Sequence, residues 1–153
     1  MSIDERTLFL IKPDGVQRGL IATVLGRIEK KGLKIIGLKM MKVSENLAKK
    51  HYEEHVGKPF FENLVSFITS SPIIAIALQG PNVIELTRNM IGKTNPLDAL
   101  PGTIRADFGI EVGRNLVHGS DSPNSGIREV SIFFQDTELM DWESNLSEWI
   151  TES

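Results

Sequence analysis

The chain has 153 residues, a length that suits one ordinary domain with a sizeable core, and we expect residues 1–153 to form a single domain. Hydrophobic residues make up 41% and charged residues 24%, close to the globular average, which excludes disordered and fibrous classes. The net charge is −3 and cysteine is absent, which argues against a dedicated nucleic-acid partner and excludes disulfides, thiol catalysis and cysteine metal sites.

The N-terminus carries no recognisable targeting segment. Its first six residues (MSIDER) include three charged side chains, too many for the start of a signal peptide. The longest apolar run, residues 72–78, is far too short to span a bilayer. We therefore expect a cytoplasmic protein with no membrane partner.

The first half of the chain predicts two strands with a helix between them. Residues 7–11 form a short apolar run stopped by Pro13, as in a buried strand that enters a turn. Gly32 follows a basic last turn and ends a helix with one apolar face. The residues of that face are Leu20, Ile21, Val24, Leu25 and Ile28. Residues 33–43 mix apolar side chains with lysines, which suits a long strand with one solvated side.

Two more helices are expected before the next strand. Ser44 can cap a helix in which Leu47, His51 and His55 share a face. A second amphipathic helix follows Pro59. Its apolar residues are Phe61, Leu64, Val65 and Ile68.

A central strand, a helix and a long loop follow. Residues 72–78 are continuously apolar and predict the strand, and Asn82 can cap the helix. The buried stripe of that helix would be Val83, Leu86 and Met90. Residues 92–114 show no periodicity and contain four glycines and two prolines. Because long structureless loops are uncommon unless they serve a function, this loop is a candidate site.

The chain ends with a short strand, a helix and an aromatic tail. Residues 116–118 read as the strand, and Ser122 followed by Pro123 is a good helix start. The helix would bury Val130, Phe133 and Phe134. The order of elements predicts an α+β, ferredoxin-like (split βαβ) fold, a four-stranded antiparallel sheet with helices on one face and a long active-site loop.

Residues 115–122 (NLVHGSDS) place His118 at the end of an apolar run, next to a glycine. An imidazole that does chemistry needs room for a substrate, which a neighbouring glycine provides, and polar groups that fix its tautomer. A histidine in a polar turn after a strand would show the same pattern. The segment alone leaves both interpretations open.

Cations from three other segments favour the catalytic interpretation. Lys12 ends the first strand, Arg88 lies on the helix before the long loop, and Arg105 lies within that loop. In a ferredoxin-like sheet the first and last strands lie close together, so Lys12 and His118 would face one cleft. Such a group suits phosphoryl transfer, which needs positioning and charge stabilisation, because a neutral imidazole can accept the phosphoryl group and release it again.

The chain resembles nucleoside diphosphate kinases nearly end to end. Five motifs in the family's order and spacing carry the similarity: residues 11–19 (IKPDGVQRG), 58–61 (KPFF), 94–96 (TNP), 101–105 (PGTIR) and 115–122. Each motif alone is modest evidence, and together they are specific. The resemblance implies ping-pong transfer of the γ-phosphate from a nucleoside triphosphate, typically ATP, to a nucleoside diphosphate through a phosphohistidine on His118.

The resemblance also implies a role for each site residue. Glu129 would hydrogen-bond the other ring nitrogen of His118, Ser120 would support the site through its hydroxyl, and Tyr52 would stand near the transferred group. Asn115 and Lys12 would contact the sugar hydroxyls. The residues implied to hold the phosphates are Lys12, Arg88, Thr94 and Arg105.

The resemblance also implies how the base and the metal ion would be bound. Phe60 would stack on the base, with Leu64 and Val112 alongside. Stacking reads the flat face of a base and not its edge, so every base would be accepted. Mg²⁺ would be held mainly through phosphate oxygens, and we assign it no protein ligand. The implied partners are nucleoside triphosphates and diphosphates.

The resemblance implies a homo-oligomer as well, commonly a hexamer and sometimes a tetramer. The tail with Trp142 and Trp149 favours the hexamer here, because C-terminal extensions can seal neighbouring subunits. The chain departs from the family pattern at Ala106, where glycine is frequent, and at Leu97 and Ala99, which replace smaller or more polar residues. Since the loop often contributes to subunit contacts, these changes bear on the oligomer more than on the chemistry.

Two further motifs and one further function were weighed against phosphoryl transfer. His51 and His55 have the i, i+4 spacing of a zinc protease helix, but Tyr52 stands where that motif needs a glutamate. Residues 92–94 (GKT) copy the end of a P-loop, but Thr87 stands where its first glycine is required. A nucleotide-binding module without catalysis would have lost the nucleophile or the phosphate cations, and the sequence retains both.

Overall fold

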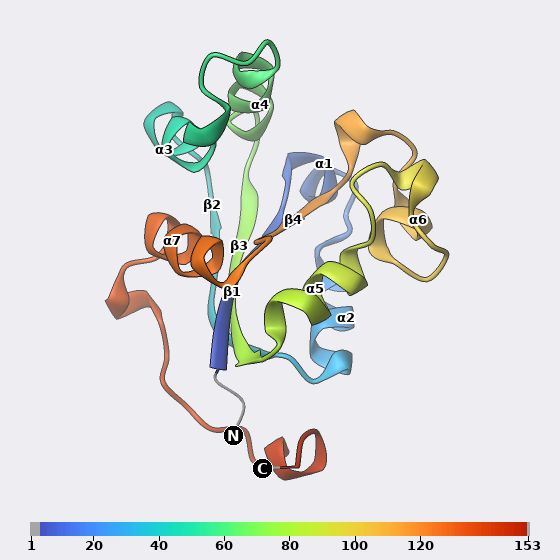
Figure 1. Cartoon of the computed structure of the whole chain (residues 1–153), viewed down its shortest axis with the longest axis vertical. Coiled ribbons are helices and arrows are strands. Elements are labelled where there is room, and N and C mark those ends of the chain that lie inside the picture. The colour runs from blue at the N-terminus through green and yellow to red at the C-terminus, as the bar shows by residue number, and fades with distance from the viewer. Residues whose placement is uncertain (1–3, 153) are drawn as a thin grey trace.

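A four-stranded sheet forms the centre of the computed structural model, which describes residues 4–152 (Figure 1). The strands are β1 (Asp4–Ile11), β2 (Lys34–Met41), β3 (Ile73–Pro81) and β4 (Val117–Gly119). Their order is β2-β3-β1-β4, and every neighbouring pair is antiparallel. The ferredoxin-like α+β fold expected from the sequence is therefore confirmed, and the run predicted as a central strand is central.

Helices cover both faces of this sheet, whereas the sequence predicted helices on one face. Within the described residues the helices are α1 (Pro13–Gln17), α2 (Ile21–Lys31), α3 (Glu45–His51), α4 (Phe61–Ile68), α5 (Val83–Ile91), α6 (Ile104–Phe108) and α7 (Pro123–Phe133). Leu8 and Leu10 of β1 face a core made with α3, α4 and α7, while Phe9 and Ile11 face a core made with α2, α5 and α6. The continuous apolar run in β3 is typical of a strand buried on both sides, so it was the signal for two covered faces.

Three of the predicted helix ends are formed as expected. The Ser44 hydroxyl accepts the N–H of Leu47 at the start of α3, and the Ser122 hydroxyl accepts the N–H of Ser125 at the start of α7. Gly32 ends α2 in a left-handed conformation with φ of 90°, which a glycine adopts without steric cost. Of these three helices, α7 is the one that carries a predicted site residue, Glu129.

The start of α5 differs from the prediction. Asn82 takes a left-handed backbone conformation with φ of 56°, and its side chain caps nothing. The buried residues of α5 are Val83, Ile84, Thr87 and Ile91, whereas Leu86 and Met90 are only half-buried. The helix is thus rotated relative to the predicted stripe, and this rotation brings Thr87 and Ile91 against β4.

The long loop contains more regular structure than the sequence predicted. Residues 92–114 include the short turns Pro96–Asp98 and Val112–Arg114 and the helix α6 between them. The Thr103 hydroxyl accepts the N–H of Ala106 and begins α6. With five residues, α6 is shorter than the windows in which helical periodicity can be recognised.

The C-terminal tail runs back along the edge strand β2. The Met140 N–H donates to the carbonyl of Ile36, and the Trp142 indole N–H donates to the carbonyl of Ile35. Trp149 lies further along and leaves 81% of its surface exposed. One tail tryptophan thus packs on the body of its own chain, and the other presents its ring to the outside.

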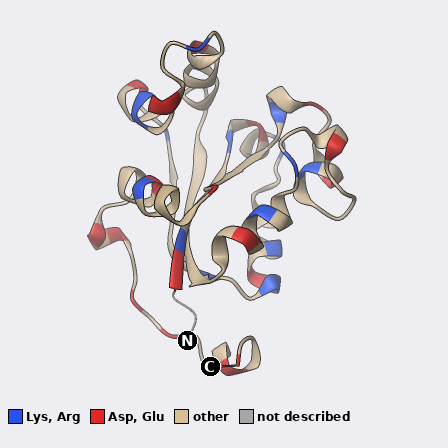
Figure 2. Cartoon of the chain, viewed as in Figure 1, with Lys and Arg blue, Asp and Glu red and all other residues tan. Residues whose placement is uncertain are grey.

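Charged residues of both signs are interspersed over the helices of both layers (Figure 2). On α2, for example, Arg27 and Lys30 alternate with Glu29, and on α3 Glu45 pairs with Lys49 at 2.8 Å. None of the helices between residues 4 and 152 is both long and apolar enough to cross a bilayer.

Candidate active site

His118 lies on β4 opposite Leu10 of β1 and points to the face of the sheet that α3 and α7 cover. The preceding Leu116 is fully buried and has φ of 74°, a left-handed conformation that a leucine rarely adopts. A strained backbone conformation of this kind persists only where the packing around it holds it in place, and it is frequent at functional sites. The short strand therefore presents His118 from a tightly held backbone.

Gly119 serves a different purpose from the one predicted. We expected its missing side chain to leave room for a substrate beside His118. In the structure the position that a side chain of Gly119 would take lies on the opposite face of the sheet from His118. A Cβ added there would lie 2.8 Å from a methyl carbon of Ile91. The glycine allows α5 to pack closely on β4, because alternate residues of a strand face opposite sides.

The expected carboxylate and hydroxyl lie beside the histidine. The Nε2 atom of His118 is 2.5 Å from Oε1 of Glu129 on α7, and the Ser120 hydroxyl donates to the same oxygen at 3.1 Å. Ser120 is fully buried and also accepts the N–H of Leu8 on β1 at 3.0 Å. Because an ionised carboxylate only accepts, Nε2 carries the proton and Nδ1 is left with a free lone pair.

Lys12 directly follows β1, next to strand β4 that carries His118. Its Nζ donates to Oδ1 of Asn115 at 2.8 Å, and its backbone N–H donates to the carbonyl of Leu116. Burial, followed by the charge of the neighbouring Arg105, lowers the pKa of Lys12 to about 8, with Asp14 acting in the opposite direction. The first and last strands therefore bring an amine with a lowered pKa close to the backbone that carries His118.

Arg105 is a buried cation that ties the long loop to β4. Its guanidinium donates to the carbonyls of Asn115, Gly92 and Val117 at 3.2, 3.3 and 2.8 Å. Burial, followed by the charge of Arg88, lowers its pKa to about 10, so it remains charged at neutral pH. Three of its five N–H groups are used in this way, and two are left for an anion.

The two remaining phosphate candidates come from α5 and the loop. Arg88 donates to the carbonyl of Gly119 at 3.2 Å, so its guanidinium lies beside β4. Thr94 is exposed, and its carbonyl accepts the side-chain N–H of Asn115 at 3.0 Å. Arg88 thus contacts β4 itself, and Thr94 contacts Asn115, which lies just before that strand.

A group of exposed apolar side chains lies on the α3–α4 segment and on the turn Val112–Arg114. Phe60 is 45% exposed and Val112 is 53% exposed, while Leu64 is half-buried. The two segments touch where the Arg114 guanidinium lies 4.3 Å from the ring centre of Phe67. Exposed apolar side chains on two linked segments suit a flat ligand held between them.

Tyr52 follows α3 and is half-buried. Burial, followed by the charge of Glu129, raises the pKa of its hydroxyl to about 12. The phenol is therefore neutral at any pH at which the protein works, and it can donate a hydrogen bond but not act as a base.

Sequence reasoning missed a contact that shapes the backbone next to His118. The Asp14 carboxylate accepts the N–H of Leu116 at 2.9 Å across 102 positions in the chain. Gly15 makes this approach possible, because an added Cβ would lie 3.1 Å from the Leu116 carbonyl and closer still to Ile11. The motif in residues 11–19 contains both residues, but nothing in it indicates which distant strand they contact.

The two rejected motifs differ in conformation from a zinc protease helix and from a P-loop. α3 ends at His51, and His55 lies in the following turn Glu53–His55, so the pair does not share a helix. Among the described residues, no group of three or more histidine or carboxylate side chains is placed to hold a metal. Gly92 ends helix α5 with φ of 90°, whereas the glycine-rich turn of a P-loop follows a strand.

Residues 5–139 match the family model described as nucleoside diphosphate kinase. The nucleoside diphosphate kinase of Carboxydothermus hydrogenoformans is 55% identical over 148 residues, covering 97% of this chain and 99% of the relative. That of Staphylococcus carnosus is 56% identical over 149 residues, with the same coverage.

Solved structures agree with these relatives. A halophilic nucleoside diphosphate kinase from Halobacterium salinarum, in complex with CDP, superposes with a TM-score of 0.95 at 49% identity and covers 98% of this chain and 100% of that one. A nucleoside diphosphate kinase family protein from Babesia bovis superposes with a TM-score of 0.94 at 42% identity and covers 96% and 99%.

Proposed function

The chain belongs to the nucleoside diphosphate kinase family, and we propose that His118 is the residue through which it passes phosphoryl groups. The enzyme transfers the γ-phosphate of a nucleoside triphosphate to a nucleoside diphosphate by a ping-pong route through a phosphohistidine. The observation that carries the assignment to His118 is the contact of its Nε2 with the buried Glu129, which leaves Nδ1 as the free nucleophile.

In the first half of the reaction the lone pair of Nδ1 attacks the γ-phosphorus. The bond from that phosphorus to the β–γ bridging oxygen breaks, and its electron pair leaves with the diphosphate. The ring of His118 keeps its Nε2 proton and gains positive charge, which the Glu129 carboxylate stabilises at 2.5 Å. Ser120 holds that carboxylate in place, and the second half-reaction reverses these steps with another diphosphate.

Four residues hold the phosphates in this proposal: Lys12, Arg88, Thr94 and Arg105. The three cationic side chains among them are held in place before substrate binds, because Arg88 and Arg105 donate to backbone carbonyls and Lys12 donates to Asn115. Preorganised charge lowers the barrier most when it needs no rearrangement during the reaction. Asn115 and Lys12 would also contact the sugar hydroxyls, and Tyr52, as a neutral phenol, would lie near the transferred group.

The base would stack on Phe60, with Leu64 and Val112 alongside. The exposure of Phe60 and Val112 supports this, because a stacking surface has to be open to the ligand. No charged group is required for such a contact, and bases of any kind would therefore be accepted.

Enzymes of this family generally need a divalent cation, and we propose that it is Mg²⁺. The part of the chain that the structure describes offers no cluster of three carboxylate or imidazole groups that could hold a metal. Mg²⁺ commonly binds through substrate phosphates and water, so it would enter with the triphosphate as part of the substrate. Its role there would be to screen the charge of the phosphate oxygens.

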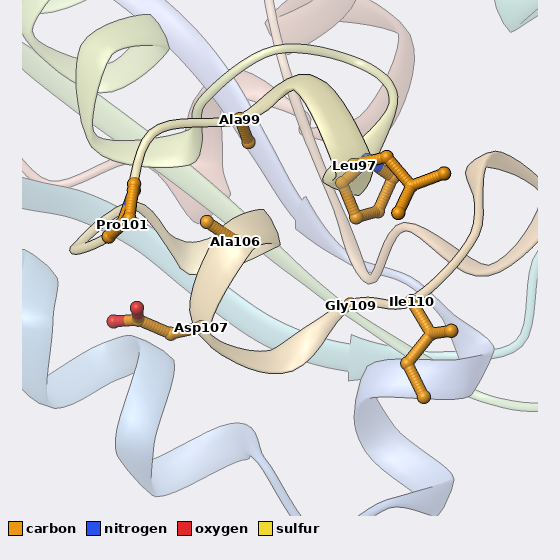
Figure 3. A pocket seen from close by; sticks show the side chains of 8 residues that line it. Leu97, Ala99, Pro101, Ala106, Asp107, Gly109 and Ile110 are labelled. Carbon is orange, nitrogen blue, oxygen red and sulfur yellow. The ribbon is translucent and has the colours of Figure 1, made fainter.

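We also propose a homo-oligomer, with a hexamer favoured over a tetramer. The long loop and α6 line a hollow of about 400 Å³ that contains none of the proposed site residues (Figure 3). Of its lining residues Leu97 and Ile110 are 81% and 80% exposed, and Leu100, next to the lining residues Ala99 and Pro101 in the chain, is 73% exposed. So much exposed apolar surface on one segment suits a contact with another subunit. The mass of the particle from sedimentation or light scattering tests the proposal.

Three further expectations from the sequence stay predictions. They are a single domain over residues 1–153, a cytoplasmic location and the lack of a dedicated nucleic-acid partner. Limited proteolysis, cell fractionation and nucleic-acid titration at stated salt would test them in turn.

The assignment to His118 is tested by labelling with γ-labelled ATP. The wild-type protein should form a phosphoprotein that is labile to acid, stable to base and discharged by a nucleoside diphosphate. His118→Ala should take up no label and produce no nucleoside triphosphate. If His118→Ala still labels and turns over normally, another residue is the nucleophile.

A further inference from the structure

His51, the last residue of α3, is a buried imidazole to which the proposed mechanism gives no role. It is 6% exposed, and both of its ring nitrogens are buried without a hydrogen-bond partner. An imidazole N–H left unpaired in this way destabilises the folded chain relative to an apolar ring of the same shape. The ring of His51 packs instead against three other rings, those of Tyr52, His118 and Phe133.

One of those contacts is the nucleophile itself. The rings of His51 and His118 lie edge to face, with centroids 4.9 Å apart and planes at 84°. On another side the ring of Phe133, on α7, packs against His51 at 5.2 Å and 87°. His51 is therefore held between α7 and β4, and His118 is held between His51 and Glu129.

The geometry of the His118 ring shows why such a contact matters. The Cβ atom and the hydrogen bond at Nε2 fix two points of the ring. Two points define an axis and not a plane, so a ring held only there could still turn and swing Nδ1 away from the γ-phosphorus. A third contact, on the face or edge of the ring, is needed to fix the direction of Nδ1. The ring of His51 supplies it.

The charge state of His51 suits this purpose. Burial is the largest of the causes that lower its pKa to about 2, and the nearby groups His118, Arg128, Lys12 and His55 act in the same direction. The ring is thus neutral at any pH at which the enzyme works. A neutral ring adds no repulsion when His118 becomes positively charged on phosphorylation.

We propose that His51 is a positioning residue which fixes the plane of the His118 ring and thereby directs Nδ1 at the phosphorus. The proposal rests on the assignment of His118 as the nucleophile. It concerns the rate of phosphoryl transfer and not the binding of nucleotide, and it requires a flat ring at this position but no ionisable or hydrogen-bonding group.

The test is the single-turnover rate of His118 phosphorylation at a series of ATP concentrations. In His51→Ala the rate at saturating ATP should fall roughly 10- to 100-fold, the effect expected from a misdirected nucleophile, with the ATP Kd within about twofold of wild type. His51→Phe should restore the rate to within about threefold, because phenylalanine keeps the flat ring. His51→Leu, which keeps most of the volume without the ring, should behave like His51→Ala and replaces it if that variant does not fold.

The control is Ile68→Ala, which truncates a fully buried residue of the same core on α4. It should lower the unfolding midpoint as His51→Ala does, because both leave a cavity, but leave the transfer rate unchanged. A wild-type rate in both His51→Ala and His51→Leu would overturn the proposal. So would a rate in folded His51→Phe as low as in His51→Ala, since the imidazole nitrogens would then be required. If His118→Ala still labels, the assignment of the nucleophile fails instead, whatever the His51 variants do.

Discussion

The two parts of the proposed site are built in opposite ways. The nucleophile region, residues 116–120 with Glu129, is buried apart from the half-buried His118, and its polar side chains are joined by hydrogen bonds of 2.5 and 3.1 Å. The base region, formed by Phe60, Leu64 and Val112, is apolar and largely exposed. Fixed polar groups suit a reaction whose geometry is the same for every substrate. Open apolar surface suits a ligand whose identity varies, because stacking does not read the edge of a base.

The comparison predicts that damage in the two regions affects different kinetic constants. A change in the nucleophile region should lower kcat, because its contacts strengthen as charge develops on His118. A change in the base region should raise KM, because stacking is the same in the ground state and the transition state.

The largest effect is expected for Glu129→Gln. The neutral amide no longer stabilises positive charge on His118, and its NH₂ group can hold the ring in the wrong tautomer. We expect kcat to fall by about 100-fold or more with KM little changed, as for other enzymes that lose the carboxylate orienting a histidine. Steady-state kinetics measures this. Glu138→Gln, which removes a partly exposed partner of Lys39, is the control and should leave kcat near the wild-type value.

Arg105→Ala tests whether the nucleophile region depends on the loop that crosses it. Removal of the guanidinium leaves three carbonyls without their donor, and we expect the free energy of unfolding to fall by about 2–3 kcal/mol. Urea unfolding measures this. Arg27→Ala breaks an ion pair with Asp107 that is about one-third exposed and should cost less than about 1 kcal/mol. Equal losses in the two variants would contradict a structural role for Arg105.

Phe60→Ala should damage the base region alone. Loss of one stacking ring costs on the order of 1–3 kcal/mol, and because this ring is half exposed we expect the lower part of that range, a KM increase of about tenfold. The increase should be similar for purine and pyrimidine nucleotides, with kcat unchanged. Val56→Ala, an exposed apolar residue in the same segment, should have no effect. An increase confined to one class of base would show that the site reads base edges.

The smallest effect is a pH dependence that comes from Lys12. Its pKa is lowered to about 8, so in the free protein it loses its charge as the pH rises through that value. Diphosphate affinity should therefore fall by about threefold between pH 7.5 and 8.5, where the phosphates of the ligand are already ionised. Calorimetric titration of His118→Ala with ADP isolates binding from transfer. An affinity that stays constant over this range would contradict the assignment of Lys12.

Much of the nucleophile region could be predicted because its signals are local. Ser122 with Pro123 placed α7, and α7 carries Glu129 to His118. The apolar run before His118 predicted β4, and the ferredoxin-like order of elements predicted that this strand lies close to β1 and Lys12. The resemblance to a family then supplied roles for residues whose contacts no spacing could reveal.

What could not be predicted depends on contacts between distant segments. The bond from Asp14 to the Leu116 N–H, the role of Gly119 against Ile91 and the position of His51 against His118 all arise when strands and helices meet in space. The sequence showed His51 only as a residue on one helix face with His55 and as half of a possible metal motif, because its spacing to His55 was visible and its packing was not. α6 was missed because a five-residue helix has too few turns to show a periodic face.

The most direct test of the contrast between the two regions is a single-turnover phosphorylation series for Glu129→Gln and Phe60→Ala side by side. The dependence of the rate on ATP concentration separates the rate at saturation from the ATP Kd. We predict that Glu129→Gln lowers the saturating rate and keeps the Kd, while Phe60→Ala raises the Kd and keeps the saturating rate. If both variants change the same constant, the division of the site into a transfer region and a binding region is wrong.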